Sequence, residues 1–293
     1  MKKLKWMLGA AAILAMSVAL TGCGGDKQAD NTKGGPTGNV MVYTSIYPDI
    51  IDNMCKPNVQ KAFPNMKVSW FQGGTEKVVT KITGEIKANK IAADALMVAD
   101  PSYYLKLDEQ KLLMHYVSPE AKNVISDKDK DGAWTAVRIS NMIIAYNSDK
   151  LKANDIRVEE GNSAIQNKLL TGEYAAAIIL EENILKLANT KKEPLKVSYP
   201  TDGVIMVPSP IAIFEASANK DGAKALVDWW LSKEGQQAVV KGWMHSVRGD
   251  VPAPTGAPET KTLVENRVKV DWAKLANNNA EIKEEFRKRV MDK

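Results

Sequence analysis

Short β-rich runs alternate with amphipathic stretches from about residue 40 onward, and this alternation limits the fold more than any other feature. Residues 39–44, 67–71 and 95–99 are β-rich, and the segments between them, at residues 48–62 and 75–89, have helical character. Strands that are joined by crossover helices form a parallel sheet with right-handed connections. The pattern therefore predicts an α/β fold built on a parallel sheet.

Polar and small residues follow each of these three strands. In open α/β sheets the ligand crevice lies beyond the carboxyl ends of the strands, so these residues are expected along one rim. A Gly-Gly-Thr turn at a helix start also offers free backbone N–H groups to an anion, although Thr75 as a plain helix N-cap explains it equally well. The predicted rim residues are Thr44, Ser45, Gly73, Gly74, Thr75, Asp100 and Ser102.

The rest of the chain continues the alternation. Further short strands are predicted at residues 134–138, 142–147, 175–180, 196–199, 205–207 and 211–214, and helices at residues 161–170, 221–231 and 233–243. Trp229 and Trp230 lie in an amphipathic helix and are expected to pack, one in the core and one at the surface. No internal repeat is visible.

The N-terminus has the parts of a lipoprotein export signal in order. Lys2, Lys3 and Lys5 precede an uncharged apolar run, residues 6–20, that is too short for a membrane span. Leu-Thr-Gly-Cys follows and resembles a lipobox, in which Cys23 would take the lipid. We expect residues 1–22 to be the signal peptide and residues 23–38 to be a flexible tether.

Composition excludes several classes of function. The formal net charge of +5 falls to +2 without the three signal lysines (5 − 3), which argues against nucleic acid as a partner. Only Cys55 remains after Cys23, so no internal disulfide is expected, and Cys55 is expected to be buried. Two histidines leave little material for a zinc site. We expect no cofactor and no resident metal.

Several stretches together resemble one family, the extracellular solute-binding proteins of ABC importers, in the ferric-iron and hexose-phosphate branch. The match runs from about residue 40 to 255 and rests on the order and spacing of many short motifs. These motifs are at residues 42–45, 71–75, 98–104, 141–147, 160–168, 180–183, 199–203, 208–213 and 231–237.

The resemblance implies a type II periplasmic-binding-protein architecture, with two lobes joined by a two-strand hinge. The first lobe would comprise residues 39–138 and 204–293, and the second lobe residues 139–203. The hinge passages would lie near residues 135–141 and 203–208. The implied partners are a small-molecule ligand and a membrane permease, and we expect a monomer outside the cytoplasm, anchored to the membrane at Cys23.

The second lobe is expected to be truncated. Members of the family carry a longer stretch where this chain has residues 148–160, which are too few for a βα unit of roughly 30 residues. A lobe of about 65 residues is marginal even when complete. We therefore expect a weakly stable second lobe whose sheet lacks cover on part of its surface.

Five further polar positions are candidates for ligand contact, and each has a structural alternative. Asn162 and Ser163 open a helix, where Ser163 with Gln166 also fits a capping box. Glu181 and Glu182 end a strand, and one of them could accept hydrogen bonds from sugar hydroxyls or bind a hard cation. The remaining candidate sits in a possible ordinary turn and is Asp202.

The resemblance favours a sugar phosphate or phosphonate over ferric iron. The ferric branch has adjacent tyrosines where this chain has Glu181-Glu182-Asn183, and it often adds a histidine where this chain has Ile46-Tyr47. Ferric iron or another metal ion stays as the alternative ligand. An exported hydrolase is the remote alternative, because no nucleophile elbow, phosphate loop or histidine-activated nucleophile is evident. We therefore expect that the protein is not an enzyme.

Overall fold

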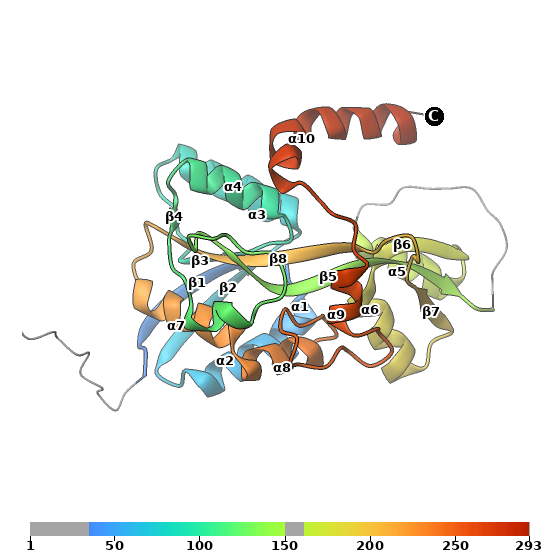
Figure 1. The fold of residues 1–293 in the computed structure, drawn as a ribbon, viewed down its shortest axis with the longest axis horizontal. Helices are drawn as coiled ribbons and strands as arrows, with labels where there is room; N and C mark the ends of the chain where they lie inside the picture. The colour runs from blue at the N-terminus through green and yellow to red at the C-terminus, as the bar shows by residue number, and fades with distance from the viewer. Residues whose placement is uncertain (1–34, 150–160, 293) are drawn as a thin grey trace, which may run out of the picture. The chain divides into compact units, whose positions relative to one another are not determined.

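The structure is a computed structural model that describes residues 35–149 and 161–292. Within them, eight strands form one sheet with the main order β2-β1-β3-β8-β5-β6, while β4 pairs with β8 and β7 pairs with β5 (Figure 1). The strands are β1 Gly38–Thr44, β2 Met66–Gln72, β3 Ala95–Met97, β4 Leu113–Met114, β5 Thr135–Asn147, β6 Ala176–Leu180, β7 Leu195–Ser198 and β8 Ile205–Phe214.

The sheet is mixed, so the prediction of a parallel sheet holds only for its first part. β1 pairs in parallel with β2 and β3, and every other pairing of the described strands is antiparallel. Crossover helices return the chain in the same direction only between β1, β2 and β3. β8 begins opposite Met142 of β5 and near its end lies opposite Ala95 of β3, and it runs antiparallel to both strands.

β5 and β8 are each one long strand, although four short strands were predicted in their place. They pair from Thr135 opposite Ile211 to Met142 opposite Ile205, with a register shift between Ala136 and Arg138. The polar residues in the middle of β5 are buried and hydrogen-bonded, so the strand continues through them. The predicted hinge passages therefore coincide with a pair of neighbouring strands.

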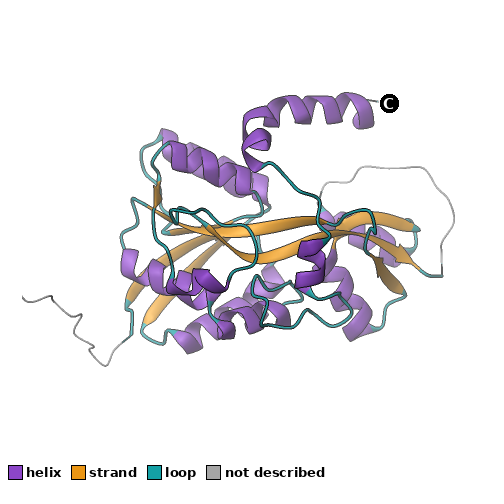
Figure 2. Cartoon of the chain, viewed as in Figure 1, coloured by secondary structure: helices purple, strands orange, loops and turns teal. Residues whose placement is uncertain are grey.

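Helices flank the strands on both faces (Figure 2). β1 places Val42 in one hydrophobic cluster and Tyr43 in another, because successive side chains of a strand point to opposite faces. The helices and turns of the first half are α1 Pro48–Ile50, η1 Ile51–Cys55, α2 Lys56–Ala62, α3 Thr75–Lys87, α4 Pro101–Glu109 and η2 Pro119–Asn123. Those of the second half are α5 Asn162–Thr171, α6 Glu181–Lys186, η3 Leu187–Lys191, α7 Lys220–Leu231, α8 Lys233–Lys241, α9 Thr260–Glu265, α10 Trp272–Phe286 and η4 Arg287–Met291.

A third, smaller cluster, here called the distal cluster, belongs to β5, β6 and β7 and the helices beside them. It consists of Ile143, Ala145, Leu169, Ile179, Ile184, Leu187 and Leu195. The strand residues among them share one face of β5, β6 and β7, and the helix residues pack on that face. The opposite face carries Ile144 and Ile178, which lie directly across from each other and are 42 % and 66 % exposed.

Two smaller expectations can be settled from burial. Trp229 and Trp230 are both buried, with edge-on rings 5.1 Å apart, so the prediction that one lies at the surface is wrong. Cys55 is a free, fully buried thiol, as expected, and burial raises its pKa to about 12.

The predicted signal peptide, Cys23 and the tether up to residue 34 lie outside the described residues, and so does most of the segment expected to be too short, at residues 150–160. β1 already begins at Gly38, the last residue of the predicted tether. Among the helices of residues 35–149 and 161–292, none has the length and apolar character that a bilayer crossing requires.

Candidate functional site

The ends of β1, β2 and β3 meet, as the sequence predicted for the rim. The backbone N–H of Ser45 donates to the carbonyl of Met97 at 3.0 Å, and that of Gly73 donates to the carbonyl of Thr44 at 3.2 Å. Thr44 is fully buried, and its hydroxyl accepts from the N–H of Ile46 at 3.1 Å. The Ser45 hydroxyl is buried and has no hydrogen-bond partner. Of these residues, Ser45 is therefore the one with unused polar capacity.

The start of α3 differs in detail from the prediction. Gly74, not Thr75, is the N-cap, and no side chain caps the helix, so the interpretation of Thr75 as a capping residue is wrong. The first N–H groups of a helix lack intrahelical partners and carry the positive end of its dipole. The Lys77 side chain lies close to Gly73. This corner of the rim therefore offers free backbone N–H groups, with Lys77 and Glu76 both in the first turn of α3.

Asp100 and Ser102 are brought together, but they satisfy each other. One oxygen of the Asp100 carboxylate accepts from both the Ser102 N–H, at 3.1 Å, and the Ser102 hydroxyl, at 2.6 Å. Asp100 thereby acts as the N-cap of α4. The structural role of this pair is established by geometry, and its predicted ligand contact stays a prediction.

The predicted capping box of Ser163 and Gln166 does not form. Gly161, with a φ of +81°, is the N-cap of α5, and Ser163 lies inside the helix. Asn162 instead uses its side-chain oxygen to accept the N–H of Leu180 at 3.1 Å, which ties the start of α5 to the end of β6. The Asn162 side chain also lies near the Tyr47 hydroxyl and acts to lower its pKa.

Glu181 is a fully buried structural anchor. Its Oε1 accepts from the backbone N–H and the side-chain amide of Asn141, at 3.0 and 2.5 Å, and its Oε2 accepts from the Tyr199 hydroxyl at 2.6 Å. The Nε2 of His245, also fully buried, lies 3.4 Å from Oε1. Burial, followed by the Glu181 charge, raises the pKa of Tyr199, so its phenol remains a donor. Both oxygens of Glu181 are thus engaged.

Glu182, unlike Glu181, keeps one carboxylate oxygen without a hydrogen-bond partner, and this difference distinguishes the two predicted carboxylates. It is 1 % exposed, its Oε1 accepts from the Ser140 hydroxyl at 3.1 Å, and its Oε2 has no hydrogen-bond partner. Burial raises the pKa of Glu182, and the nearby Arg138 guanidinium opposes part of that rise. Glu182 is therefore the carboxylate with free binding capacity.

Arg138 is the cation of this cluster, and the sequence analysis missed it. Its side chain is buried in β5, its Nη1 donates to the Ser140 hydroxyl at 3.0 Å, and its Nε has no partner. No carboxylate of the described residues lies within 4.0 Å of the guanidinium, so it forms no direct ion pair with Glu182. Burial lowers the pKa of Arg138, and Glu182 is the strongest charge opposing this.

Tyr47 joins the loop after β1 to this cluster, and it was noted in the sequence only as a departure from the ferric branch. Burial raises the pKa of Tyr47 most, and the Glu182 charge raises it further, while Arg138 and the Asn162 side chain act in the other direction. The phenol therefore lies within reach of the electrostatic field of both charges. The rim of β1 and the start of α6 consequently share one buried polar site.

An arginine within a run of apolar residues was the signal that could have revealed this site. Residues 135–147 are apolar around Arg138, Ser140 and Asn141, and buried polar residues need partners. Asp202, in contrast, is an exposed turn residue, and no contact of its side chain with the cluster is present in the described part of the chain.

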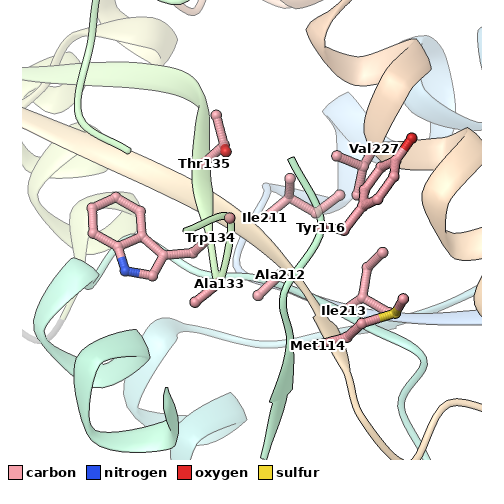
Figure 3. A pocket seen from close by; sticks show the side chains of 10 residues that line it. Met114, Tyr116, Ala133, Trp134, Thr135, Ile211, Ala212, Ile213 and Val227 are labelled. Carbon is pink, nitrogen blue, oxygen red and sulfur yellow. The ribbon is translucent and has the colours of Figure 1, made fainter. Parts of the chain in front are cut away.

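Two hollows of the described structure lie away from this cluster. The cavity in Figure 3 is about 10 Å³, about the room that one water needs, and Trp134, Thr135 and Tyr116 are among its lining residues. A larger hollow of about 370 Å³ lies between α2 and β2, beside Lys56, Met66 and Trp70. Neither is lined by a predicted site residue. Among the described residues no group of three or more His, Cys, Asp or Glu side chains could hold a metal ion.

Comparison with known proteins agrees with the predicted resemblance. A family model described as bacterial extracellular solute-binding protein matches residues 155–273. The periplasmic binding protein AfuA from Actinobacillus pleuropneumoniae, solved with exogenous fructose-6-phosphate bound, is 18 % identical over 87 % of this chain and 99 % of its own, with a TM-score of 0.71. Iron-bound HitA from Pseudomonas aeruginosa is 16 % identical over 85 % of this chain and 99 % of its own, with a TM-score of 0.73.

A ferric binding protein from Campylobacter jejuni is also similar, with 18 % identity over 84 % of this chain and 97 % of its own and a TM-score of 0.67. The predicted α/β fold of two-lobed periplasmic binding proteins is thus confirmed. AfuA binds a sugar phosphate and HitA binds iron, so the similarity of fold does not determine the ligand of this chain.

Proposed function

We propose that this protein is the ligand-capture subunit of an ABC importer, and that it binds a small anionic or polyhydroxylated solute. The observation that carries the proposal is Arg138, a buried guanidinium with an unpartnered Nε beside the loop that follows β1. Buried charges in proteins are ordinarily paired, and a guanidinium suits phosphate and carboxylate oxygens. The family match and the fold support a binding role outside the cytoplasm.

The remaining contacts would come from both sides of the cluster. The Ser45 hydroxyl and the uncapped N-terminus of α3 would serve the anionic group, and Glu182, Tyr47 and Asn162 would serve hydroxyl or amino groups. A sugar phosphate or phosphonate remains the first choice. Thr44, Gly73, Gly74 and Thr75 would contribute through the shape and backbone of the rim.

A thermal-shift screen of the full-length protein in mild detergent tests this function. A ligand at 100 times its dissociation constant should raise the free energy of unfolding by about 2.7 kcal/mol. Hexose phosphates and alkylphosphonates should shift the melting temperature, and Arg138→Met should remove the shift. Absence of a shift with every anionic compound would contradict the proposal.

Ferric iron is the second candidate, because a phenol, Tyr47, lies within the electrostatic reach of a carboxylate, Glu182. Both are hard oxygen donors. Iron loading should then produce a visible tyrosinate-to-iron charge-transfer band that Tyr47→Phe abolishes. A colourless protein after loading would rule out this candidate.

A further inference from the structure

The buried charges around the proposed site do not sum to a site for a simple anion. Arg138 contributes one positive charge, and Glu181 and Glu182 contribute two carboxylates, all of them at most 3 % exposed. Lys186, the cation at the end of α6, is partly exposed and paired with Asp49. Of the neighbouring titratable groups, Tyr47, Tyr199, Cys55 and Tyr104 all have raised pKa values and add no charge. His245 lies 3.4 Å from Oε1 of Glu181, so a proton on its ring would offset Glu181 and leave Glu182 without a direct partner.

The unused hydrogen-bonding atoms are of opposite kinds and lie close together. Nε of Arg138 can only donate, and Oε2 of Glu182, when ionised, can only accept; neither has a partner. The Ser140 hydroxyl separates the two groups, with bonds of 3.0 Å to Nη1 of Arg138 and 3.1 Å to Oε1 of Glu182. These two bonds limit the distance between Nη1 and Oε1 to at most 6.1 Å (3.0 + 3.1), and it exceeds 4.0 Å because the two residues form no ion pair.

A ligand with only negative charge would accept a hydrogen bond from Nε of Arg138 but would repel the Glu182 carboxylate. A buried carboxylate is costly unless it is paired, and an added anion would increase the excess of negative charge around Glu182. A hydroxyl would give Oε2 a hydrogen bond but no compensating charge. An ammonium group would supply both a donor and the missing positive charge.

We infer that the ligand is a small zwitterion, whose anionic group binds Arg138 and whose ammonium group binds Glu182. This inference rests on the proposed function and narrows its ligand class. The short span between the two residues requires that a linker of only a few carbon atoms separate the ligand's charges. Tyr47 and Asn162 would position that linker from the side of the β1 loop and α5.

Matched ligand pairs test the inference on the full-length protein by calorimetry. The first pair is 2-aminoethylphosphonate and ethylphosphonate, and the second is glucosamine 6-phosphate and glucose 6-phosphate. In each pair the amine should bind at least about tenfold more tightly, and Glu182→Gln should remove most of that difference. Glu234→Gln, an exposed carboxylate of α8, is the control and should preserve the preference.

The outcomes separate this inference from the proposed function. Equal affinity for both members of each pair would overturn the zwitterion and leave the solute-binding function in place. No binding of any of the four compounds, together with binding of ferric iron, would overturn both. If Glu182→Gln does not fold, the comparison of the pairs on the unaltered protein still decides.

Discussion

Lys186 on α6 forms an ion pair with Asp49 at the start of α1, with 2.5 Å between Nζ and Oδ2. α1 belongs to the large cluster that includes Ile50, whereas α6 contributes Ile184 to the distal cluster. The pair therefore connects two separately packed regions. Glu182 lies one helical turn before Lys186, so the same helix face carries the proposed binding carboxylate and this contact.

Asp49→Asn should have a small effect, because both side chains are more than a third exposed and such pairs contribute about 0–1 kcal/mol. The free energy of unfolding in urea should fall by less than about 1 kcal/mol, and the difference should shrink at high salt. Ligand affinity should fall by no more than about fivefold. A loss of binding altogether would show that the pair holds the site together.

Stability should depend on pH through Glu182. Burial raises the pKa of its carboxyl in the folded protein above the unfolded value of about 4.3. The folded protein therefore keeps this proton where the unfolded chain has lost it, so the contribution to stability is complete below the unfolded pKa and is lost as the pH rises through the folded pKa.

Glu182→Gln removes this titration. The free energy of unfolding of the variant, followed in urea from about pH 4 to about pH 7, should therefore decline less than that of the unaltered protein. Glu234→Gln, whose carboxylate is exposed, should follow the unaltered protein. Parallel curves for Glu182→Gln and the unaltered protein would show that Arg138 compensates the buried carboxylate completely.

The strands and helices that alternate regularly were predictable from sequence, and the polar site was only partly so. The apolar runs of β1, β2, β3 and β6 are short and bounded by turn residues, which is the pattern that periodicity detects. β8 was predicted as two short strands, yet it runs through Pro208 and Pro210, and the pairing with β5 shifts its register next to Pro210. Arg138 and Tyr47 acquire their roles only from contacts between segments far apart in the chain.

Gly235 lies in one of the motifs that carried the family resemblance, and the structure gives that motif a structural role. A Cβ at this position would lie 2.0 Å from the carbonyl oxygen of Trp229. The next residue, Gln236, is fully buried and donates to the carbonyls of Val137 and Trp230, at 2.7 and 2.6 Å. The turn between α7 and α8 is thereby fixed against β5.

Gly235→Ala should consequently destabilise the protein by about 1–3 kcal/mol, because the backbone of the turn would have to shift. Gly84→Ala is the matched control, since nothing lies within 4 Å of its Cβ position inside α3. This second change should stabilise the protein by about 0.5–1 kcal/mol. Thermal melts of both variants measure the contrast, and equal effects would contradict the close approach.

Two neighbouring isoleucines of β6 test how far the small region around the distal cluster is covered. Ile179 is 1 % exposed and packs in that cluster, whereas Ile178, on the other face, is 66 % exposed. Ile179→Ala should lower the free energy of unfolding by about 2–5 kcal/mol. Ile178→Ala should change it by less than about 1 kcal/mol. A large loss from Ile178→Ala would mean that another part of the protein covers this face in solution.

Hydrogen exchange should separate the two ends of the sheet. β6 and the end of β5 beside it bury apolar side chains on one face only, since Ile144 and Ile178 are exposed on the other, whereas β1 buries Val42 and Tyr43 in clusters on opposite faces. Local opening costs less where fewer apolar contacts must be broken. Amides of β6 and β7 should therefore exchange at least about tenfold faster than those of β1 and β2, which corresponds to about 1.4 kcal/mol. The same gradient is expected from the predicted truncation of the second lobe. Equal, strong protection at both ends would mean that the short region forms a complete lobe, and the argument from the missing stretch would then fail.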